Sequence, residues 1–263
     1  MPQTPVRAIA VVLAGGGAND ALARSAGTAS KALVPIDGAP MGAYVLSSLR
    51  GSGLVPTIVY VGPTDDRTRA LVDHVVPPGR RLVDSLAMGL GAAVALSQAD
   101  DRLMVVTADI PWWTAEGVRS FLEDAPSVDL VYPAVASATA EAAFPGQRRT
   151  FVRLRDGRFT GGNALLLSQA AVPALLPVVD QIFSARKAPW RLASLIGLDV
   201  LWGLLSGRAR LSEIEVRVSR LLGLEGRVMV SQDAAIAADI DKPEQLSPAA
   251  REGPPLATLR GPA

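Results

Sequence analysis

The sequence contains no cysteine, a single histidine and only 5% aromatic residues, and these scarcities exclude several kinds of chemistry. Without cysteine there is no disulfide framework, no thiol nucleophile and no zinc–cysteine site. The one histidine, His74, lies in LVDHVVPPG, a context typical of a surface or loop position, so no catalytic histidine is indicated. A chain that makes no disulfides suits a reducing compartment, and we expect a cytoplasmic protein.

Neither sign of charge dominates, since the chain has 26 basic and 25 acidic residues and a formal net charge of +1. This balance provides no broad cationic field and argues against nucleic acid as a partner. The first residues, MPQTPVRAIA, lack the pattern of a secretory signal. The most hydrophobic later stretch, Leu192 to Leu205, is too short for a membrane span and contains Asp199. We therefore expect no transmembrane segment.

A length of 263 residues with 49% hydrophobic content suits one sizeable globular domain. Apolar runs rich in β-branched residues alternate with helical patterns along the first half. This alternation predicts an α/β fold with three layers and a mostly parallel, Rossmann-like central sheet. The expected strands are residues 6–13, 57–61, 103–107 and 129–135, and the expected helices are residues 40–50, 85–98 and 114–124.

The pattern changes near Arg149, where FVRLRDGRFTGGN predicts two short strands joined by a turn at Asp156 and Gly157. Residues 165–220 then predict a helical block, with Ser212 and Glu215 spaced as a capping box at its last helix. We interpret residues 149–225 as a β excursion and a helical elaboration or lid.

The chain then returns to the main domain. Arg227 to Ser231 has strand character, and Pro243 suits the first turn of a final helix. A single domain is expected over residues 1–248. Residues 249–263, rich in proline, glycine and charge, predict a disordered tail.

A glycine-rich segment directly follows the first expected strand. Successive glycines carry no Cβ, so their backbone N–H groups can approach a polyphosphate closely. Lys31, in SKALVPIDGAPM, adds a compact positive charge nearby. A tight turn after a buried strand is the structural alternative. The segment consists of Leu13, Ala14, Gly15, Gly16 and Gly17.

A carboxylate stands at the end of another expected strand, in LMVVTADIP. If that strand is parallel to the first, Asp109 lies at the same sheet edge as the glycine segment. Magnesium prefers oxygen ligands and commonly takes one or two carboxylates together with substrate phosphate. Asp239 and Asp241, in DIDKPEQL, could supply the second carboxylate. The alternative role of Asp109 and Asp241 is to cap the helices that follow them.

The ordered segments VVLAGGG, KALVPIDGAPM, DSLAMGLGAAV, TADIP, TGGN and DIDKPEQL resemble the landmarks of the MobA-like NTP transferases, from about Val6 to Leu246. The resemblance implies a GT-A-like α/β fold and transfer of a nucleoside monophosphate from an NTP to an acceptor, with pyrophosphate released. It further implies that residues 13–17 contact the nucleotide through main-chain groups, that Lys31 neutralises phosphate and that Asp109 binds Mg²⁺.

Two further sets of site residues follow from the resemblance. Ser85 and Gly89 match the segment that approaches the base or ribose, although a helix start and a close packing position explain them equally well. Gly161, Gly162 and Asn163 lie where relatives present a turn that faces the acceptor.

Basic residues offer candidate contacts to an anionic acceptor, above all Arg149 and Arg153, which stand beside Arg148 and Arg155. The solvent-facing side of a strand is the alternative for any one of them. A second cluster, Arg186, Lys187 and Arg191 around Trp190, suits an acceptor lid, a homodimer surface, a membrane-surface element or simple packing. Trp112 and Trp113 either shape the substrate mouth or pack in the core.

One departure from the family pattern concerns the residues after the glycines. Many relatives carry an Arg-Met pair there, whereas this chain reads ANDALAR, and Arg24 is the residue that could replace the arginine. The expected activity is in-line attack on the α-phosphorus by a phosphate or hydroxyl of a small acceptor, which we expect to be phosphorylated. This reaction needs no protein nucleophile.

Three other functions stay open at this point. A GT-A glycosyltransferase would usually present Asp-x-Asp, but Asp109 is followed by Ile110 and Pro111. A catalytically silent nucleotide-binding protein would explain the altered residues after Gly17. An NAD-linked oxidoreductase fits least, because the three glycines do not form G-x-G-x-x-G.

Overall fold

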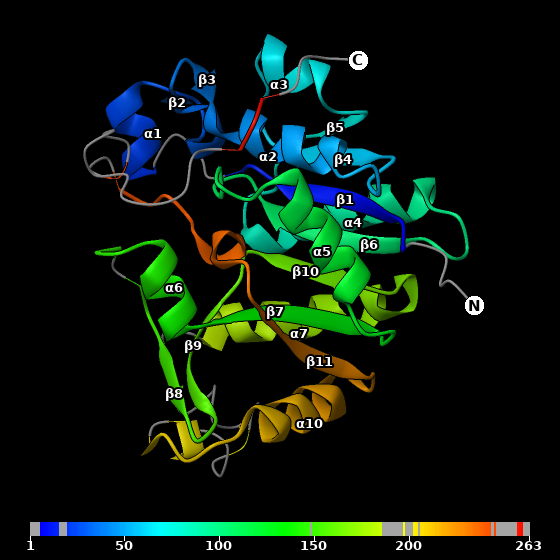
Figure 1. Cartoon of the computed structure of the whole chain (residues 1–263). Coiled ribbons are helices and arrows are strands. Elements are labelled where there is room, and N and C mark those ends of the chain that lie inside the picture. The colour runs from blue at the N-terminus through cyan, green and yellow to red at the C-terminus, as the bar shows by residue number, and fades with distance from the viewer. Residues whose placement is uncertain are drawn as a thin grey trace.

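The computed structural model describes residues 6–15, 20–147, 149–185, 197, 202–204, 206–242, 245 and 257–259. Its main sheet has the strand order β5-β4-β1-β6-β10-β7-β9-β8, with β11 paired to the other edge of β7 (Figure 1). The described strands are β1 (Ala8–Leu13), β2 (Pro35–Ile36), β3 (Ala39–Pro40), β4 (Ile58–Val61), β5 (His74–Val76), β6 (Arg102–Thr107), β7 (Leu130–Ala136), β8 (Val152–Leu154), β9 (Gly157–Gly161), β10 (Ala164–Leu167) and β11 (Gly226–Ser231).

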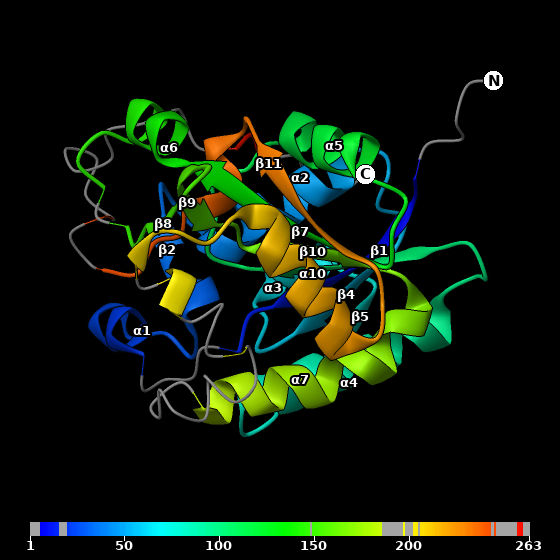
Figure 2. The same cartoon turned by 90° about the horizontal axis from the view of Figure 1, so that it is seen from below.

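Helices cover both faces of the sheet. Figure 2 shows α2 and α5 on one side and α4 and α7 on the other. This arrangement confirms the expected three layers. The described helices are α1 (Ala21–Ala26), α2 (Met41–Gly51), α3 (Asp66–Ala70), α4 (Leu82–Leu96), α5 (Ala115–Asp124), α6 (Ser137–Ala143), α7 (Val172–Ala185) and α10 (Leu211–Leu222), with 3-10 turns η1 (Lys31–Leu33), η2 (Gln169–Ala171) and η3 (Ala234–Ala237).

Strand β1 forms the centre of the parallel part of the sheet, because it pairs in parallel with both β4 and β6. Its successive side chains alternate between the two cores: Ala10 and Val12 pack with the α2 and α5 side, whereas Ile9 and Val11 pack with the α4 side. Burial on both faces explains why β1 is one continuous apolar run. Parallel pairing also aligns the strand ends. The carboxyl end of β1 therefore lies beside the carboxyl ends of β4 and β6.

The expectation of a helical block over residues 165–220 is wrong at its start. Residues 164–167 form β10, which runs antiparallel between β6 and β7. Leu166 and Leu167 are fully buried on opposite faces of the sheet. A short apolar run buried on both faces lacks the polar alternation of an exposed strand, and periodicity cannot distinguish it from a buried helix.

The β excursion forms as expected, but its turn lies one residue earlier. Leu154 pairs with Gly157, so Arg155 and Asp156 are the turn residues. Gly157 begins β9 with a φ of 141°, which L side chains rarely adopt. The Asp156 carboxylate accepts a hydrogen bond from the backbone N–H of Leu211 at 2.7 Å. This contact ties the hairpin to the first residue of α10.

Helix α10 begins before the predicted capping box. Arg210 is its N-cap, and the Glu213 carboxylate accepts from the Arg210 backbone N–H at 3.0 Å. Glu215 instead accepts from the backbone N–H of Val228 at 2.8 Å and joins α10 to β11. The expectation for Ser212 and Glu215 is therefore corrected, since tertiary pairing with β11 engages the glutamate.

The last part of the chain is described only in pieces. Strand β11 confirms the expected strand over residues 227–231, whereas the helix expected at Pro243 lies outside the described residues. In the predicted tail, Ala257 is buried and donates its N–H to the carbonyl of Pro111 at 2.9 Å. The disordered tail over residues 249–263 stays a prediction. Among the described helices, none has the length and apolar character required to cross a bilayer.

Candidate active site

The site lies where β1 and β6 end at the same edge of the sheet. The chain leaves β1 at Leu13, and the Ala108 N–H donates to the Leu13 carbonyl at 3.1 Å. On the other side, the Ala14 N–H donates to the carbonyl of Val61 at 2.9 Å. These bonds hold the loop after β1 between the loops that follow β4 and β6. Ligands of open α/β sheets bind at such an edge.

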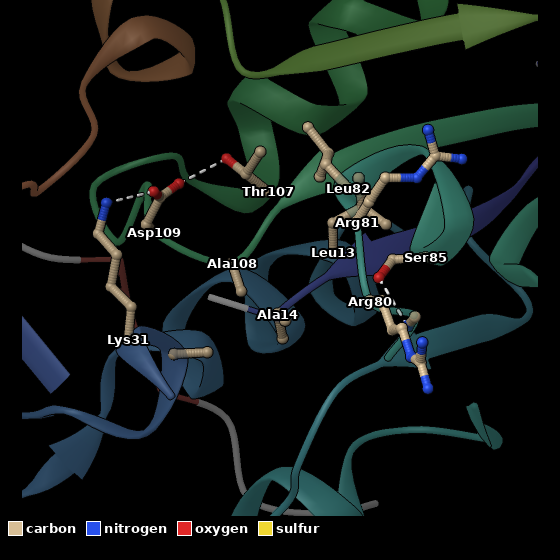
Figure 3. Close-up of a pocket in the computed structure, with 13 residues that line it drawn as sticks. Leu13, Ala14, Lys31, Arg80, Arg81, Leu82, Ser85, Thr107, Ala108 and Asp109 are labelled. Atoms are coloured by element: carbon tan, nitrogen blue, oxygen red, sulfur yellow. Dashed lines mark hydrogen bonds and ion pairs between the residues drawn. The ribbon is translucent and has the colours of Figure 1, made fainter. Parts of the chain in front are cut away.

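A pocket of about 260 Å³ opens at this edge (Figure 3). It contains five of the residues predicted to bind nucleotide, whereas Gly16 and Gly17 lie outside the described part of the chain. The pocket is lined by Leu13, Ala14, Gly15, Lys31, Ala32, Gly79, Arg80, Arg81, Leu82, Ser85, Thr107, Ala108 and Asp109.

Lys31 and Asp109 face one another across the mouth of this pocket, as Figure 3 shows. The Lys31 Nζ lies 2.6 Å from Asp109 Oδ2 and also contacts the carboxylate of Asp241. Although burial acts to lower it, the pKa of Lys31 is raised, because these two carboxylates stabilise the ammonium. Thr107 donates its hydroxyl to Asp109 Oδ1 at 2.5 Å. Both oxygens of Asp109 therefore have a partner, which fixes the orientation of the carboxylate.

Asp109, Asp239 and Asp241 each present a carboxylate oxygen within 4.8 Å of the others. The Ile240 N–H donates to the Asp109 carbonyl at 3.0 Å and joins the two segments. Burial, with repulsion from Asp109 and Asp241, raises the pKa of Asp239 to about 6. Burial opposes ionisation of Asp241 as well, but its contacts with Lys31 lower its pKa. Three converging oxygen ligands suit a hard cation such as Mg²⁺.

Ser85 and Gly89, both on α4, have different surroundings. Ser85 lines the pocket, and its hydroxyl accepts from the Gly79 N–H at 2.9 Å. A Cβ at Gly89 would lie 2.5 Å from Val11 Cγ1 and 2.7 Å from Val61 Cγ2. Gly89 thus lets α4 approach the sheet closely, in agreement with the packing alternative, and it does not line the pocket.

The turn expected to face the acceptor, residues 161–163, leads into the first residue of β10. Gly162 donates its N–H to the Pro133 carbonyl at 2.8 Å, and Asn163 donates its N–H to the Ile236 carbonyl at 2.8 Å. The Asn163 carbonyl accepts from the Thr107 N–H at 3.1 Å. These bonds connect the segments that carry Asp109 and Asp239. The acceptor role of Gly162 and Asn163 stays a prediction.

The arginines predicted to bind the acceptor lie in separate places. Arg149 is half-buried and donates to the carbonyl of Ala237 and to Gln147 Oε1. Burial lowers its pKa, against the effect of the Asp239 charge. Arg153 is exposed on β8, in the hairpin that extends from the sheet (Figure 1).

The other basic and aromatic candidates contribute less to the described pocket. Arg24 is exposed on α1 and does not line it. Trp112 and Trp113 are both buried and pack edge-on against Phe144 and Phe121. Arg148, Arg186, Lys187, Trp190 and Arg191 lie outside the described residues.

The family model of the MobA-like NTP transferase domain matches residues 10–192, which span β1, the glycine segment, Lys31, Asp109 and β10. The chain belongs to the MobA-like NTP transferase family. It is accordingly a nucleotidyltransferase. Asp239 and Asp241 lie beyond the matched residues, so their assignment depends on the geometry described above.

Solved structures extend the likeness over nearly the whole chain of this MobA-like protein. A hypothetical transferase from Thermus thermophilus has 41% sequence identity and a TM-score of 0.83, covering 92% of this chain and 100% of that one. CMP:2-keto-3-deoxy-manno-octonic acid synthetase complexed with CTP has 14% identity, a TM-score of 0.53 and coverage of 91% and 95%. The 2-C-methyl-D-erythritol 4-phosphate cytidylyltransferase, also from Thermus thermophilus, has 14% identity, a TM-score of 0.52 and coverage of 93% and 97%. A comparison with curated proteins gave no match.

Sequence reasoning missed three residues that shape the site of this nucleotidyltransferase. Thr107 orients Asp109, and the Thr-Ala-Asp order at a strand end is the signal that could have revealed it. Arg80 and Arg81 line the pocket just before α4. Arg81 is paired with Asp84 and Asp180, and Figure 3 shows its guanidinium turned away from Lys31. The adjacent basic pair in GRRLVDSL was the available signal for both arginines.

Proposed function

We propose that this nucleotidyltransferase uses Mg²⁺ to transfer a nucleoside monophosphate from an NTP to a small, phosphorylated acceptor, with release of pyrophosphate. The convergence of Lys31 with Asp109, Asp239 and Asp241 at the mouth of the glycine-segment pocket carries this proposal. A polyphosphate needs both cationic neutralisation and oxygen ligands for its metal, and this edge of the sheet offers both.

Lys31 and the loop after β1 are proposed to hold the phosphates. The loop brings its backbone to the pocket without long side chains, because residues 14 and 15 are alanine and glycine. The Lys31 side chain is only 13% exposed, so its charge is less screened than that of a surface lysine. We propose that its ammonium moves from the carboxylates to phosphate oxygens when the donor binds.

Asp109, Asp239 and Asp241 are the residues that would hold the metal, and Thr107 keeps Asp109 oriented. When bound, Mg²⁺ would neutralise charge on the phosphoryl oxygens. Direct in-line transfer needs no covalent intermediate with the protein. An acceptor phosphate is already ionised at neutral pH and needs no general base.

The acceptor is proposed to bind on the side of the β8–β9 hairpin, where Arg153 offers an exposed guanidinium. Two structural neighbours of 14% identity are named as a cytidylyltransferase and as a synthetase complexed with CTP. CTP is therefore one of the donors to test, and these neighbours do not select it over the others. We also propose a cytoplasmic location, and homodimer formation stays a prediction from the sequence.

The experiment is a thermal-shift panel of ATP, GTP, CTP and UTP, each with and without Mg²⁺, followed by pyrophosphate release with phosphorylated acceptors. A ligand that binds only the folded state raises its stability. We expect a Mg²⁺-dependent shift for one nucleotide in the wild type and none in Asp109→Asn, which should keep its fold. Asp100→Asn removes an exposed carboxylate in the turn before β6, at the opposite edge, and is the matched control. Normal Mg²⁺-dependent turnover by folded Asp109→Asn would contradict the proposal.

A further inference from the structure

We infer that Arg149 and Gln147 are positioning residues that hold Asp239 in the geometry needed for metal binding beside Asp109 and Asp241. This role differs from the acceptor binding expected for Arg149 from the sequence. It rests on the proposed function, because it requires that these carboxylates bind a divalent metal.

The hydrogen bonds of the two side chains reach the backbone of the carboxylate segment. Arg149 donates from Nη1 to the Ala237 carbonyl and from Nη2 to Gln147 Oε1, the latter at 2.6 Å. Gln147 Nε2 in turn donates to the Asp239 carbonyl at 3.0 Å. Both terminal nitrogens of the guanidinium are therefore engaged within the protein. These bonds hold the guanidinium against the carboxylate segment, whereas its Nε is buried without a hydrogen-bond partner among the described residues.

An aromatic platform fixes the position of the guanidinium. The Arg149 Cζ lies 5.3 Å from the centroid of the Phe144 ring, which is 3% exposed. Phe144 packs edge-on against Trp112, with ring centroids 5.3 Å apart. Trp112 belongs to the loop that carries Asp109. The loop that carries Asp109 thus supports the arginine through Trp112 and Phe144. The arginine in turn contacts the segment that carries Asp239.

The carboxylate segment has backbone anchors near its two ends. The Ile236 carbonyl accepts from the Asn163 N–H at 2.8 Å, and the Ile240 N–H donates to the Asp109 carbonyl at 3.0 Å. Arg149 and Gln147 contact two of the three carbonyls between these anchors, at residues 237 and 239. Because the Asp239 side chain leaves the backbone between those contacts, a shift of this stretch would move its carboxylate relative to Asp109.

The test measures binding of Mn²⁺, a paramagnetic substitute for Mg²⁺, to the intact protein by electron paramagnetic resonance without nucleotide. Loss of the partners that orient metal ligands typically costs 10–100-fold in metal affinity. We expect Arg149→Met to weaken Mn²⁺ binding about tenfold. Arg149→Lys should recover part of this loss, because it keeps the charge but not the two-point contact. Metal-free nucleotide binding, measured in parallel, should not change.

Arg158→Met is the matched control. Arg158 also lies over a phenylalanine, 5.1 Å from the Phe151 centroid, but it is exposed on β9. Its replacement should leave the Mn²⁺ affinity unchanged. Gln147→Met is the second variant if Arg149→Met does not fold, because it removes the donor to the Asp239 carbonyl at similar size without adding a charge. We expect it to weaken Mn²⁺ binding as well.

The outcomes separate this inference from the proposed function. Wild-type Mn²⁺ binding that disappears in Asp239→Asn but is unchanged in Arg149→Met and Gln147→Met would overturn the inference and leave the proposed function intact. Equal loss of Mn²⁺ and metal-free nucleotide binding in Arg149→Met would also overturn it, since that result indicates general damage. A wild type that binds no Mn²⁺ would overturn both.

Discussion

Replacement of Asp239 by asparagine should stabilise the metal-free protein at alkaline pH. The pKa of Asp239 rises from the ordinary 3.8 to about 6, because burial and the charges of Asp109 and Asp241 disfavour its ionised form. Between these two values the folded state retains a proton that the unfolded state has lost. The free energy of unfolding therefore falls as the pH rises through this window.

The expected magnitude follows from the difference between the two pKa values. At about 1.4 kcal/mol per pH unit, ionising Asp239 in the folded state costs up to about 3 kcal/mol above pH 6. Asparagine has nearly the same shape without the charge. We expect Asp239→Asn to unfold with a free energy about 1–3 kcal/mol higher than the wild type at pH 8, and the difference should fade near pH 4.

The assay is urea unfolding of both proteins in EDTA at pH 4, 6 and 8, with Asp100→Asn as the control for an exposed carboxylate. Adding Mg²⁺ at pH 8 should then favour the wild type, because a metal at 100 times its Kd stabilises the folded state by about 2.7 kcal/mol. A stability difference that does not vary with pH, or an Asp239→Asn protein less stable than wild type at pH 8 without metal, would show that Asp239 is not destabilised by its own charge in the folded state.

Two other substitutions separate binding from packing. Lys31→Ala should weaken triphosphate binding by tenfold or more and nucleoside binding little, measured by calorimetry, because its ammonium lies beside the metal carboxylates at the pocket mouth. Equal losses for both ligands would argue against a phosphate contact. Gly89→Ala should destabilise the fold by about 1–3 kcal/mol in urea, since its Cβ would overlap Val11 and Val61. Gly91→Ala, on the open side of α4, should not destabilise, and a changed nucleotide Kd in folded Gly89→Ala would support the binding role.

Local sequence patterns were sufficient where each signal came from neighbouring residues. The continuous apolar strand β1, the strand ending before Asp109 and the helix α5 all lie within a few residues of their predicted bounds. The sheet edge that holds Lys31 and Asp109 followed from parallel pairing, because parallel strands place their carboxyl ends together.

Patterns failed where the partner of a residue lay far along the chain. β10 reads like part of a helical block, because its burial on both faces arises from β6 and β7. Glu215 has the spacing of a capping residue, but its carboxylate accepts a hydrogen bond from the Val228 N–H of β11. In the sequence Arg149 resembles a ligand-binding arginine, but in the structure it donates to Ala237 and Gln147. The sequence does not show which acceptor a given hydrogen-bond donor contacts in the folded protein.

The sequence by itself determined the family, the layered α/β fold and the residue types of the site, since these depend on local periodicity and on motifs in a recognisable order. Only the tertiary structure decided that Lys31 contacts Asp241, which lies 210 residues away in the chain. It also decided that Asp239 has a pKa of about 6, and that Gly89 packs against the sheet. The physical reason is that distance, burial and repulsion between charges depend on spatial neighbours, which chain folding alone brings together.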